Sequence, residues 1–426
     1  MDGLRTALVV GAARSGVAAA RSLAARGVAV RVYDDRADVA PELPDGVERV
    51  LPGQSPEAVV AGADVLVKSP GVPAQAAVVR AARAAGVPVW SEVELGFRLL
   101  PDGARLVGVT GTNGKTTTSE LAAAMLGAPA AGNVGRALCE VAETLAPGGT
   151  VVCELSSFQL EDVVSLRCDA AALLNVTPDH LDRHGTMEAY RDAKLRIFER
   201  QRPQDVAVLD VDDPVVAALG ELPGRGRRVE VRAADADAAG FAEGGLAGVH
   251  NRENVAAAAA LARALGVGDE AIRAAVRAFR PVPHRLERLA EIGGVTWWND
   301  SKATNVDATL KALTAFPDGR VHLILGGSDK GADFGELVRA LSGRVRAVYL
   351  TGPAGARMRP LFDRSETPAV WCGTVRAAAQ AAGDAAEPGD AVLLAPACAS
   401  FDEFANYEAR GDAFRAMVEA RAHTSQ

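Results

Sequence analysis

The segment from Leu106 to Thr118, LVGVTGTNGKTTT, constrains the fold more than any other part of the 426-residue chain. An apolar run ends at a glycine-bounded turn, and Lys115 and three threonines follow it. This order predicts a buried strand, a loop and the start of a helix. Backbone N–H groups of such a loop point at phosphate oxygens, and the helix N-terminus favours negative charge. The segment therefore predicts a nucleotide site on an α/β sheet.

The loop is shorter than the common phosphate-binding pattern, because Val109 stands where the first glycine of that pattern would be. What remains is TGTNGKTT, in which Lys115 is placed to reach the outer phosphates and Thr116 to hold Mg²⁺. A plain glycine-rich turn between a strand and a helix is the alternative. The residues predicted to surround the nucleotide are Gly111, Thr112, Asn113, Gly114, Lys115, Thr116 and Thr117.

Composition excludes several classes of protein. A net charge of -8 argues against nucleic acid as a partner. The five cysteines are scattered and form no C-x-x-C pair, which disfavours a disulfide framework or a zinc site and indicates a reducing compartment. No apolar run reaches the roughly 18 residues of a membrane span, and no signal-peptide pattern opens the chain. We therefore expect a soluble cytoplasmic enzyme of two to four domains.

Residues 1–91 are expected to form a Rossmann-like domain. A strand over 6–10, the turn GAARSG and a helix predict a βαβ unit, although Ala13 replaces the middle glycine of the dinucleotide fingerprint. The next strand ends in the acidic segment 34–36, where a ribose contact would lie. NAD, another nucleotide or a purely structural unit all fit this region. A later strand leads into KSPGVP at 68–73, where an open α/β sheet places ligands.

Residues 92–281 are expected to form a central ATPase-like domain with a parallel or mixed sheet around the phosphate loop. Glu154 ends a strand predicted over 150–155, and it is either a Mg²⁺ ligand or a solvated strand end. His180 suits a metal contact, a substrate contact or a structural role. Lys194, in a helix predicted over 186–200, is a surface residue by its sequence surroundings.

Two further features concern the rest of the chain. Asn251 and Asn254 share one face of a predicted helix, which suits a nucleobase or a phosphate. Residues 282–426 are expected to form a second Rossmann-like, doubly wound domain, because strands and helices alternate there. The polar loops of this domain carry lysines and hydroxyls that suit an anionic substrate. The predicted fold is therefore α/β with three domains.

The motifs occur in an order that resembles the Mur ligases. They are TGTNGKTTT, ELSSFQL, NVTPDHLDRH, YRDAKLRIFE, HNREN, PHRLE, NDSKATN, LGGSDKGADF and PACASFDEF. The resemblance spans nearly the whole chain. The first motif is shared with folylpolyglutamate synthases, whereas the last three, together with the N-terminal domain, are similar to the members that add D-glutamate to UDP-N-acetylmuramoyl-L-alanine.

The resemblance implies an ATP-dependent amide ligase of peptidoglycan precursor synthesis. In the family, ATP phosphorylates a substrate carboxylate, and the amine of an amino acid attacks the acyl phosphate. A tetrahedral intermediate then collapses to an amide, ADP and phosphate. Positioning and charge neutralisation supply most of such catalysis. The implied cofactors are ATP and two Mg²⁺ ions, and the expected state is a monomer.

The resemblance also implies roles residue by residue. The implied catalytic residues are Lys115, Glu154, His180 and Lys194. The implied Mg²⁺ ligands are Thr116, Glu154, His180 and Lys194, the last as a carbamate that arginine cannot readily form. The implied ATP contacts outside the loop are Asn251, Asn254, Arg285, Asp300 and Lys302. The implied UDP-substrate contacts are Arg14, Ser15, Asp34, Asp35, Arg36, Ser69, Gly71, Asn133 and Ser156. The implied D-glutamate contacts are Thr304, Lys330, Ser400, Phe401 and Tyr407.

Some positions depart from the family pattern. Arg14 stands where an apolar residue is commoner, and Phe401 stands where leucine is often found. Three alternatives remain: a Mur ligase that adds L-alanine or diaminopimelate, a folylpolyglutamate synthase, and a nicotinamide-dependent oxidoreductase. The NDSKATN segment disfavours the first, the N-terminal domain disfavours the second, and the phosphate loop is unexplained by the third.

Overall fold

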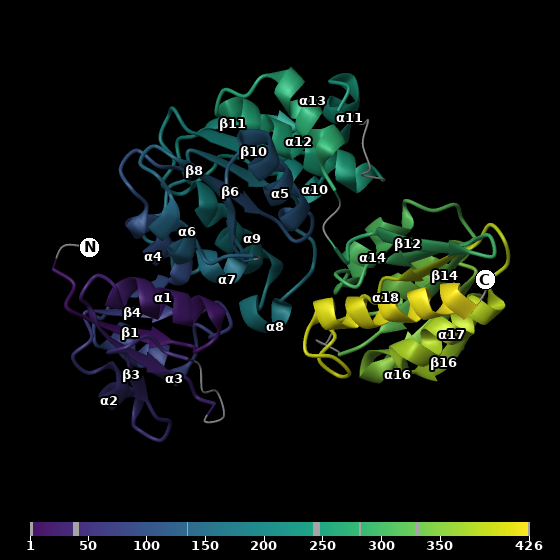
Figure 1. Ribbon diagram of the computed structural model, residues 1–426, viewed down its shortest axis with the longest axis horizontal. Helices are drawn as coiled ribbons and strands as arrows, with labels where there is room; N and C mark the ends of the chain where they lie inside the picture. The colour runs from purple at the N-terminus through teal and green to yellow at the C-terminus, as the bar shows by residue number, and fades with distance from the viewer. Residues whose placement is uncertain are drawn as a thin grey trace. The chain divides into compact units, whose positions relative to one another are not determined.

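The computed structural model describes residues 3–36, 42–133, 135–241, 248–280, 283–328 and 333–424, without the side chains of residues 182 and 424. The described residues form three sheets with helices around them (Figure 1). Two compact units account for the chain. The first unit is Met1–Val176, Arg183–Glu243 and Arg252–Ala278, and the second is Thr177–Asp182, Gly244–Asn251 and Phe279–Gln426.

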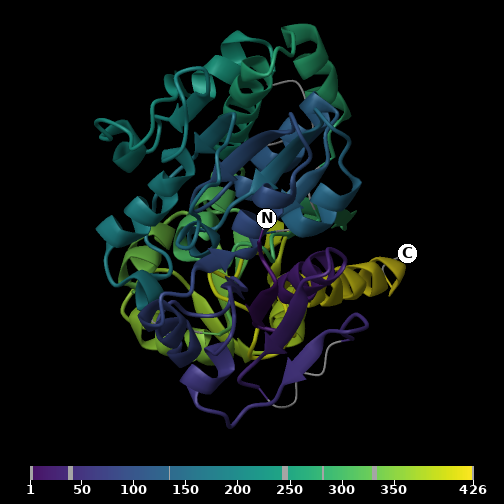
Figure 2. The same ribbon diagram turned by 90° about the vertical axis from the view of Figure 1, so that its left-hand side faces the viewer.

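The first unit begins with a parallel five-stranded sheet of order β3-β2-β1-β4-β5. Its strands are β1 (Thr6–Val10), β2 (Ala29–Tyr33), β3 (Glu48–Val50), β4 (Val65–Lys68) and β5 (Val89–Ser91). Its helices are α1 (Arg14–Ala24), α2 (Pro56–Val60) and α3 (Ala77–Ala84). Alternate strand residues serve opposite faces: Val9 packs in the core with α1, and Leu8 in the core with α2 and α3. The crossover from β1 through α1 to β2 is purple in Figures 1 and 2.

The same unit contains a parallel six-stranded sheet of order β11-β10-β9-β6-β8-β7. Its strands are β6 (Arg105–Thr110), β7 (Ala130–Gly132), β8 (Thr150–Glu154), β9 (Ala170–Leu173), β10 (Val206–Asp210) and β11 (Arg227–Val231). The helices are α4 (Glu92–Leu99), α5 (Lys115–Leu126), α6 (Leu138–Thr144), α7 (Ser157–Leu160), α9 (Met187–Leu195), α10 (Pro214–Ala217), α11 (Ala233–Ala238) and α13 (Asp269–Ala278). Helices α8 (Leu181–His184) and α12 (Val249–Ala264) begin in segments of the second unit and end in the first. Because β8 and β9 flank β6, their carboxyl ends lie beside the loop that follows β6.

The second unit is built on a mixed six-stranded sheet of order β12-β13-β17-β14-β15-β16. Its strands are β12 (Glu287–Ile292), β13 (Val295–Asn299), β14 (Val321–Gly326), β15 (Ala347–Thr351), β16 (Ala369–Gly373) and β17 (Ala391–Leu394). Its helices are α14 (Val306–Leu313), α15 (Gly335–Leu341), α16 (Gly352–Phe362), α17 (Val375–Ala385) and α18 (Tyr407–Thr424). Helices α17 and α18 share the core of one face, and α14, α15 and α16 that of the other.

The predicted α/β fold class is confirmed, and several predicted spans need correction. The antiparallel strand β12 was not predicted, because its sequence ERLAEI is half charged. Strand β9 ends at Leu173, since the residues beyond it bind the phosphate loop. The helix predicted over 186–200 gives way to a 3₁₀ turn at 196–198. The domain bounds 1–91, 92–281 and 282–426 stay a prediction. None of the helices among the described residues is long and apolar enough to cross a membrane.

Candidate active site

The predicted phosphate loop joins β6 to α5 through two glycines in conformations that other residues rarely adopt. Gly111 has a φ of 156° and Gly114 a φ of 84°. A Cβ on Gly114 would lie 2.2 Å from Oδ1 of Asn254, so a larger residue is also excluded by space. The same Oδ1 accepts a hydrogen bond from Thr118 Oγ1 (3.2 Å). Asn254 of α12 therefore contacts the loop, as expected if both bind the same nucleotide.

Asn175, just beyond β9, holds the loop from the other side, and the sequence analysis missed it. Its Oδ1 accepts from Asn113 N (2.8 Å), and its Nδ2 donates to Asn113 O (3.1 Å). Its main-chain oxygen accepts from Thr112 N (2.9 Å). One buried asparagine thus binds both backbone groups of Asn113 and fixes the middle of the loop.

Replacing Asn175 by alanine is expected to raise the KM for ATP about tenfold, because the loop loses the two buried hydrogen bonds between the Asn175 side chain and the Asn113 backbone. The free energy of unfolding should fall by about 1–3 kcal/mol. Steady-state kinetics and urea unfolding measure the two effects. Ser55→Ala is the control, since it removes the side-chain acceptor for Ala58 N at the start of α2. That control should lower stability and leave the KM for ATP unchanged, and an unchanged KM in Asn175→Ala would contradict this role.

Two lysines meet at one carbonyl of the loop. Lys115 Nζ donates to Gly111 O (2.9 Å) and to Thr112 O (2.8 Å). Lys194 Nζ donates to the same Gly111 oxygen (2.7 Å) and lies 4.3 Å from the centre of the Tyr190 ring. Lys194 is only 1% exposed, so its interpretation as a surface residue was wrong. Lys194 and Tyr190 are both buried residues of helix α9, and Tyr190 belongs to the hydrophobic core of the central sheet.

Glu154 lies at the end of β8, directly beside Val109 of β6. It is 3% exposed, which excludes a solvated strand end. Its Oε1 accepts from Asn133 Nδ2 (3.0 Å), and Asn133 N donates to the Glu154 main-chain oxygen (2.9 Å). Its Oε2 is buried and has no hydrogen-bond partner among the described residues. A buried carboxylate oxygen with unused capacity fits a hard cation such as Mg²⁺.

The donors near the loop fit Mg²⁺ only as part of a larger set. Thr116, the second residue of α5, is buried and offers a hydroxyl. Within the part of the chain that the structure describes, no cluster of three or more His, Cys, Asp and Glu side chains could hold a metal. Mg²⁺ takes several ligands from substrate phosphates and water in such sites. The residues present therefore fit an ion that arrives with its nucleotide.

His180 belongs to the short segment of the second unit that lies between β9 and α8. It has a positive φ of 54°, and its backbone N donates to Oδ1 of Asp179 (2.9 Å). Its Nε2 lies 3.5 Å from Oδ2 of the same carboxylate. A carboxylate behind an imidazole orients the ring, which is a common arrangement for a metal-binding histidine. The predicted metal role of His180 stays a prediction.

The predicted UDP-substrate residues of the N-terminal region gather at the ends of β1, β2 and β4. Asp34 Oδ2 accepts from Ala12 N (2.8 Å) in the first βα turn, and its Oδ1 accepts from Arg36 Nε (3.0 Å). Burial raises the pKa of Asp34, but these hydrogen bonds outweigh it and hold the pKa below its usual value. Tyr33 Oη donates to Asp35 Oδ1 (2.5 Å), which raises the pKa of Tyr33 to about 12.

The remaining residues of this set are less uniform. Ser69 is buried, and its hydroxyl donates to Gly11 O (2.9 Å), so this hydroxyl already serves the packing of two turns. Arg14 and Ser15 open α1, and Arg14 and Gly71 are exposed. Ser156 caps α7 in a capping box with Gln159.

In the second unit, a buried arginine of α18 joins the loop after β13 to the loop after β17. Arg410 donates to Ser301 Oγ (2.9 Å), Ser301 O (2.8 Å), Cys398 O (3.0 Å) and Ala399 O (3.2 Å). It is 1% exposed, and burial lowers its pKa to about 10. Arg410 therefore positions the two loops that carry the predicted ligand-binding residues Asp300, Lys302 and Ser400. The sequence analysis missed it, because one arginine in an Arg-rich chain carries no local signal.

Other predicted residues of this unit take varied positions. Lys302 Nζ lies 5.3 Å from the centre of the Tyr407 ring. A residue predicted to contact ATP therefore lies beside one predicted to contact D-glutamate. Ser400 is buried, Thr304 and Arg285 are half-buried, and Phe401 is 72% exposed. Asn251, near the start of α12, is buried. Lys330 lies outside the described residues.

Asp300 gives a pH-dependent prediction. Burial raises its pKa to about 6 from 3.8, although Arg285, Lys302 and the Leu286 backbone favour the charged form. A folded pKa above the unfolded one means that the folded protein binds this proton more tightly. Its stabilisation is complete below about pH 4 and is lost as pH rises through about 6, by about 3 kcal/mol. Relative to Asp300→Asn, the native protein should lose that amount of unfolding free energy between these pH values. Urea unfolding measures this, and the same pH dependence of the unfolding free energy in both proteins would contradict the prediction.

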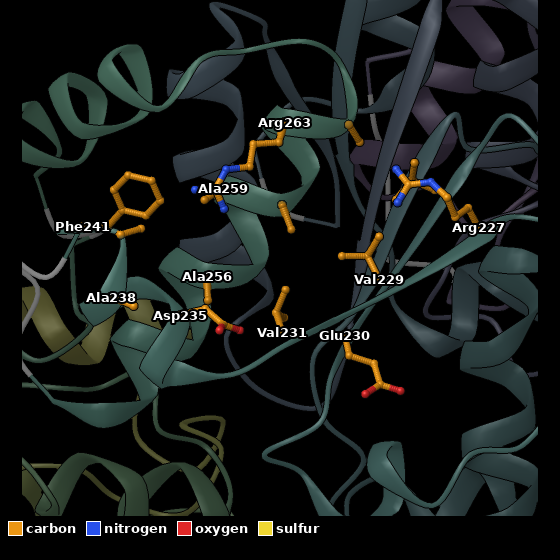
Figure 3. A pocket seen from close by; sticks show the side chains of 14 residues that line it. Arg227, Val229, Glu230, Val231, Asp235, Ala238, Phe241, Ala256, Ala259 and Arg263 are labelled. Carbon is orange, nitrogen blue, oxygen red and sulfur yellow. The ribbon is translucent and has the colours of Figure 1, made fainter.

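A cavity of about 550 Å³ lies at the free edge of the central sheet, away from the phosphate loop. Figure 3 shows Val229 and Val231 of β11 on one side, with Ala256 and Ala259 of α12 and the ring of Phe241 around the space. None of its described lining residues is a predicted site residue. This cavity is therefore separate from the predicted nucleotide site.

Three family models match successive parts of the chain. Residues 5–91 match the Mur ligase MurD-like, N-terminal domain. Residues 109–239 match the Mur ligase middle domain, and residues 284–398 match the Mur ligase, glutamate ligase domain. The middle match begins at Val109 and includes the phosphate loop, Glu154 and Lys194.

Named relatives align over almost the full length. The UDP-N-acetylmuramoylalanine--D-glutamate ligase of Anaeromyxobacter dehalogenans is 44% identical over 97% of this chain and 97% of that protein. The enzyme of the same name from Rubrobacter xylanophilus is 44% identical over 98% of this chain and 99% of that protein.

Solved structures share the fold at low identity. The UDP-N-acetylmuramate-alanine ligase of Thermotoga maritima aligns with 99% of this chain and 100% of its own, with a TM-score of 0.59 and 18% identity. A pseudomurein peptide ligase type C from Methanothermus fervidus covers 98% and 100% with a TM-score of 0.60 and 18% identity. The three matched domains and the relatives that align over nearly the full length account for the phosphate loop and its surroundings. The chain belongs to the Mur ligase family.

Proposed function

We propose that the protein is an ATP-dependent ligase that joins D-glutamate to UDP-N-acetylmuramoyl-L-alanine in peptidoglycan precursor synthesis. The observation that carries the proposal is the 44% identity, over nearly the whole chain, to relatives named UDP-N-acetylmuramoylalanine--D-glutamate ligase. The phosphate loop supports the ATP requirement, because its strand, glycines and lysine have the geometry of a phosphate-binding turn. Oxidoreductase chemistry leaves this loop without a role.

The proposed reaction is the one that the family resemblance implies. An oxygen of the L-alanine carboxylate attacks the γ-phosphorus of ATP, and the bond to ADP breaks. The amine of D-glutamate then attacks the acyl carbon, loses a proton, and displaces phosphate. Lys115, once it leaves the Gly111 and Thr112 carbonyls, neutralises charge on the transferring phosphoryl group. The backbone N–H groups at the start of α5 support the same phosphates.

Metal ions complete the proposed site. Bound Mg²⁺ would neutralise charge on the phosphates. Thr116 and the unused Oε2 of Glu154 are the proposed ligands of one ion. A carbamate of Lys194 is the proposed ligand of a second ion, and His180 is also proposed as a Mg²⁺ ligand. Asn133 holds the other oxygen of Glu154 and fixes the direction of the carboxylate.

The remaining assignments follow the reaction. The UDP moiety is assigned to the residues around Asp34 and the loop at 69–71, and the D-glutamate to the loops that Arg410 holds. ATP and a UDP-linked substrate are cytoplasmic metabolites, so we assign the enzyme to the cytoplasm. A monomer is the proposed state.

An amino acid panel tests the proposal. Phosphate release from ATP is measured with UDP-N-acetylmuramoyl-L-alanine and either D-glutamate, L-glutamate, L-alanine or diaminopimelate. Release with D-glutamate alone is the expected result. Release with another amino acid would support the ligase reaction but change the assigned amino acid substrate. No release with any of them would overturn the proposal.

A further inference from the structure

The loop of residues 69–72 is one turn that carries two proposed substrate contacts, Ser69 and Gly71. Val72 N donates to Ser69 O (3.0 Å) and closes the turn. Ser69 N donates to Val10 O (2.9 Å), and Ser69 Oγ to Gly11 O (2.9 Å), so the turn is fixed to the end of β1. These bonds hold the start of the turn, and its second half needs another support.

Arg183 of α8 supplies that support. Its Nη1 donates to Pro70 O (2.9 Å) and its Nη2 to Val72 O (3.3 Å). The guanidinium carbon lies 3.8 Å from the centre of the Phe158 ring. One planar cation thus binds two carbonyls of the same turn while an aromatic ring fixes its plane.

The carboxylate of Glu161 links Arg183 to Lys68, the residue that precedes the turn. Glu161 Oε2 accepts from Arg183 Nη2 (3.0 Å) and lies 3.4 Å from Nζ of Lys68, the last residue of β4. Lys68 is fully buried and also pairs with Asp162 (2.6 Å). Glu161 and Asp162 directly follow α7 in the central part of the chain. The turn is therefore anchored at both ends to one acidic pair of the central region.

We infer that Arg183 is a positioning residue for the UDP-linked substrate: it keeps the turn at 69–72 in the shape that binds this substrate. The inference rests on the proposed function, and no family model or relative described above assigns a role to this arginine. A lysine at the same position would keep the charge near Glu161, but it lacks the planar fork that binds both carbonyls.

Arg183→Lys tests the inference. We expect the KM for UDP-N-acetylmuramoyl-L-alanine to rise about tenfold or more, with kcat and the KM for ATP within about twofold of the native values. Glu161→Gln should raise the same KM by a smaller factor, since Lys68 keeps its pair with Asp162. Arg263→Lys is the matched control, because Arg263 also pairs with a carboxylate, Asp269 (2.7 Å), beside the Phe241 ring (5.1 Å). It should change neither KM.

Calorimetric titration of each protein with the UDP-linked substrate separates this inference from the proposed function. Weaker binding to Arg183→Lys than to the native protein supports the inference even if D-glutamate is not ligated. Native binding and turnover with an unchanged KM in Arg183→Lys would overturn the inference alone. An equal rise in both KM values would also overturn it, because a general loss of structure does not distinguish the substrates. If Arg183→Lys fails to fold by circular dichroism, Glu161→Gln decides in the same assay.

Discussion

Replacement of Lys115 by alanine is expected to abolish ATP turnover and to leave the fold intact. Its Nζ reaches the carbonyls of Gly111 and Thr112, so the ammonium lies within the loop that would surround the phosphates. Without it, the developing charge on the transferring phosphoryl group loses the cation that the loop supplies. A loss of kcat of about a thousandfold or more is the expected size, as for the removal of other preorganised donors in catalytic sites.

Lys311→Ala provides the comparison for that variant. Lys311 lies on α14 and forms a partly exposed i,i+4 ion pair with Asp307 (3.2 Å). Its removal changes net charge by the same amount and should leave turnover unchanged, since partly exposed pairs contribute little to stability. Both variants should retain the native circular dichroism spectrum. Near-native turnover by Lys115→Ala would show that the loop does not bind the reacting phosphates.

Lys194→Ala is expected to lose about a hundredfold or more of kcat, and added acetate should restore part of it. The reason is the proposed carbamate: an amine that has taken up CO₂ presents an anionic oxygen, and a small carboxylate in the space left by the side chain replaces that oxygen. Lys194 is buried beside the phosphate loop, at 1% exposure, so the truncated side chain leaves a confined space. Phosphate release is measured with and without acetate.

Lys194→Arg separates the carbamate from the positive charge. Arginine keeps a cation near Gly111 O but does not readily take up CO₂. This variant should be as inactive as Lys194→Ala, and acetate should not rescue it, because the arginine side chain fills the site. Substantial activity in Lys194→Arg would show that the ammonium form is the functional one. Removal of CO₂ from the buffer should lower the activity of the native protein.

The sequence predicted the elements whose signals are local. The strand at 106–110, the glycine turn and the helix from Lys115 follow from a few neighbouring residues, and the structure places them at 105–110 and 115–126. Glu154 was placed correctly beside the loop, because the ends of neighbouring parallel strands meet at one edge of a sheet. Only the family resemblance pointed to Lys194, since nothing in its neighbouring sequence predicts burial.

The residues that fix the loops were not predicted, because their partners are distant in the chain. Asn175 binds Asn113 across 62 positions. Arg410 binds Ser301 across 109 positions, and Arg183 binds Pro70 across 113. A lone asparagine or arginine has no periodic or compositional signal, and only the packing of the sheet ends decides its partners. Strand β12 was missed for a related reason, since its pairing with β13 and not its own composition makes it a strand.

The most direct measurement follows heavy oxygen from the substrate into phosphate. UDP-N-acetylmuramoyl-L-alanine with labelled oxygen in its alanine carboxylate is incubated with ATP, Mg²⁺, D-glutamate and the native protein, and both products are weighed by mass spectrometry. Formation of an acyl phosphate predicts one labelled oxygen in each released phosphate and a product that has gained one glutamate residue and kept one labelled oxygen. Unlabelled phosphate, or phosphate without the glutamyl product, would contradict the account.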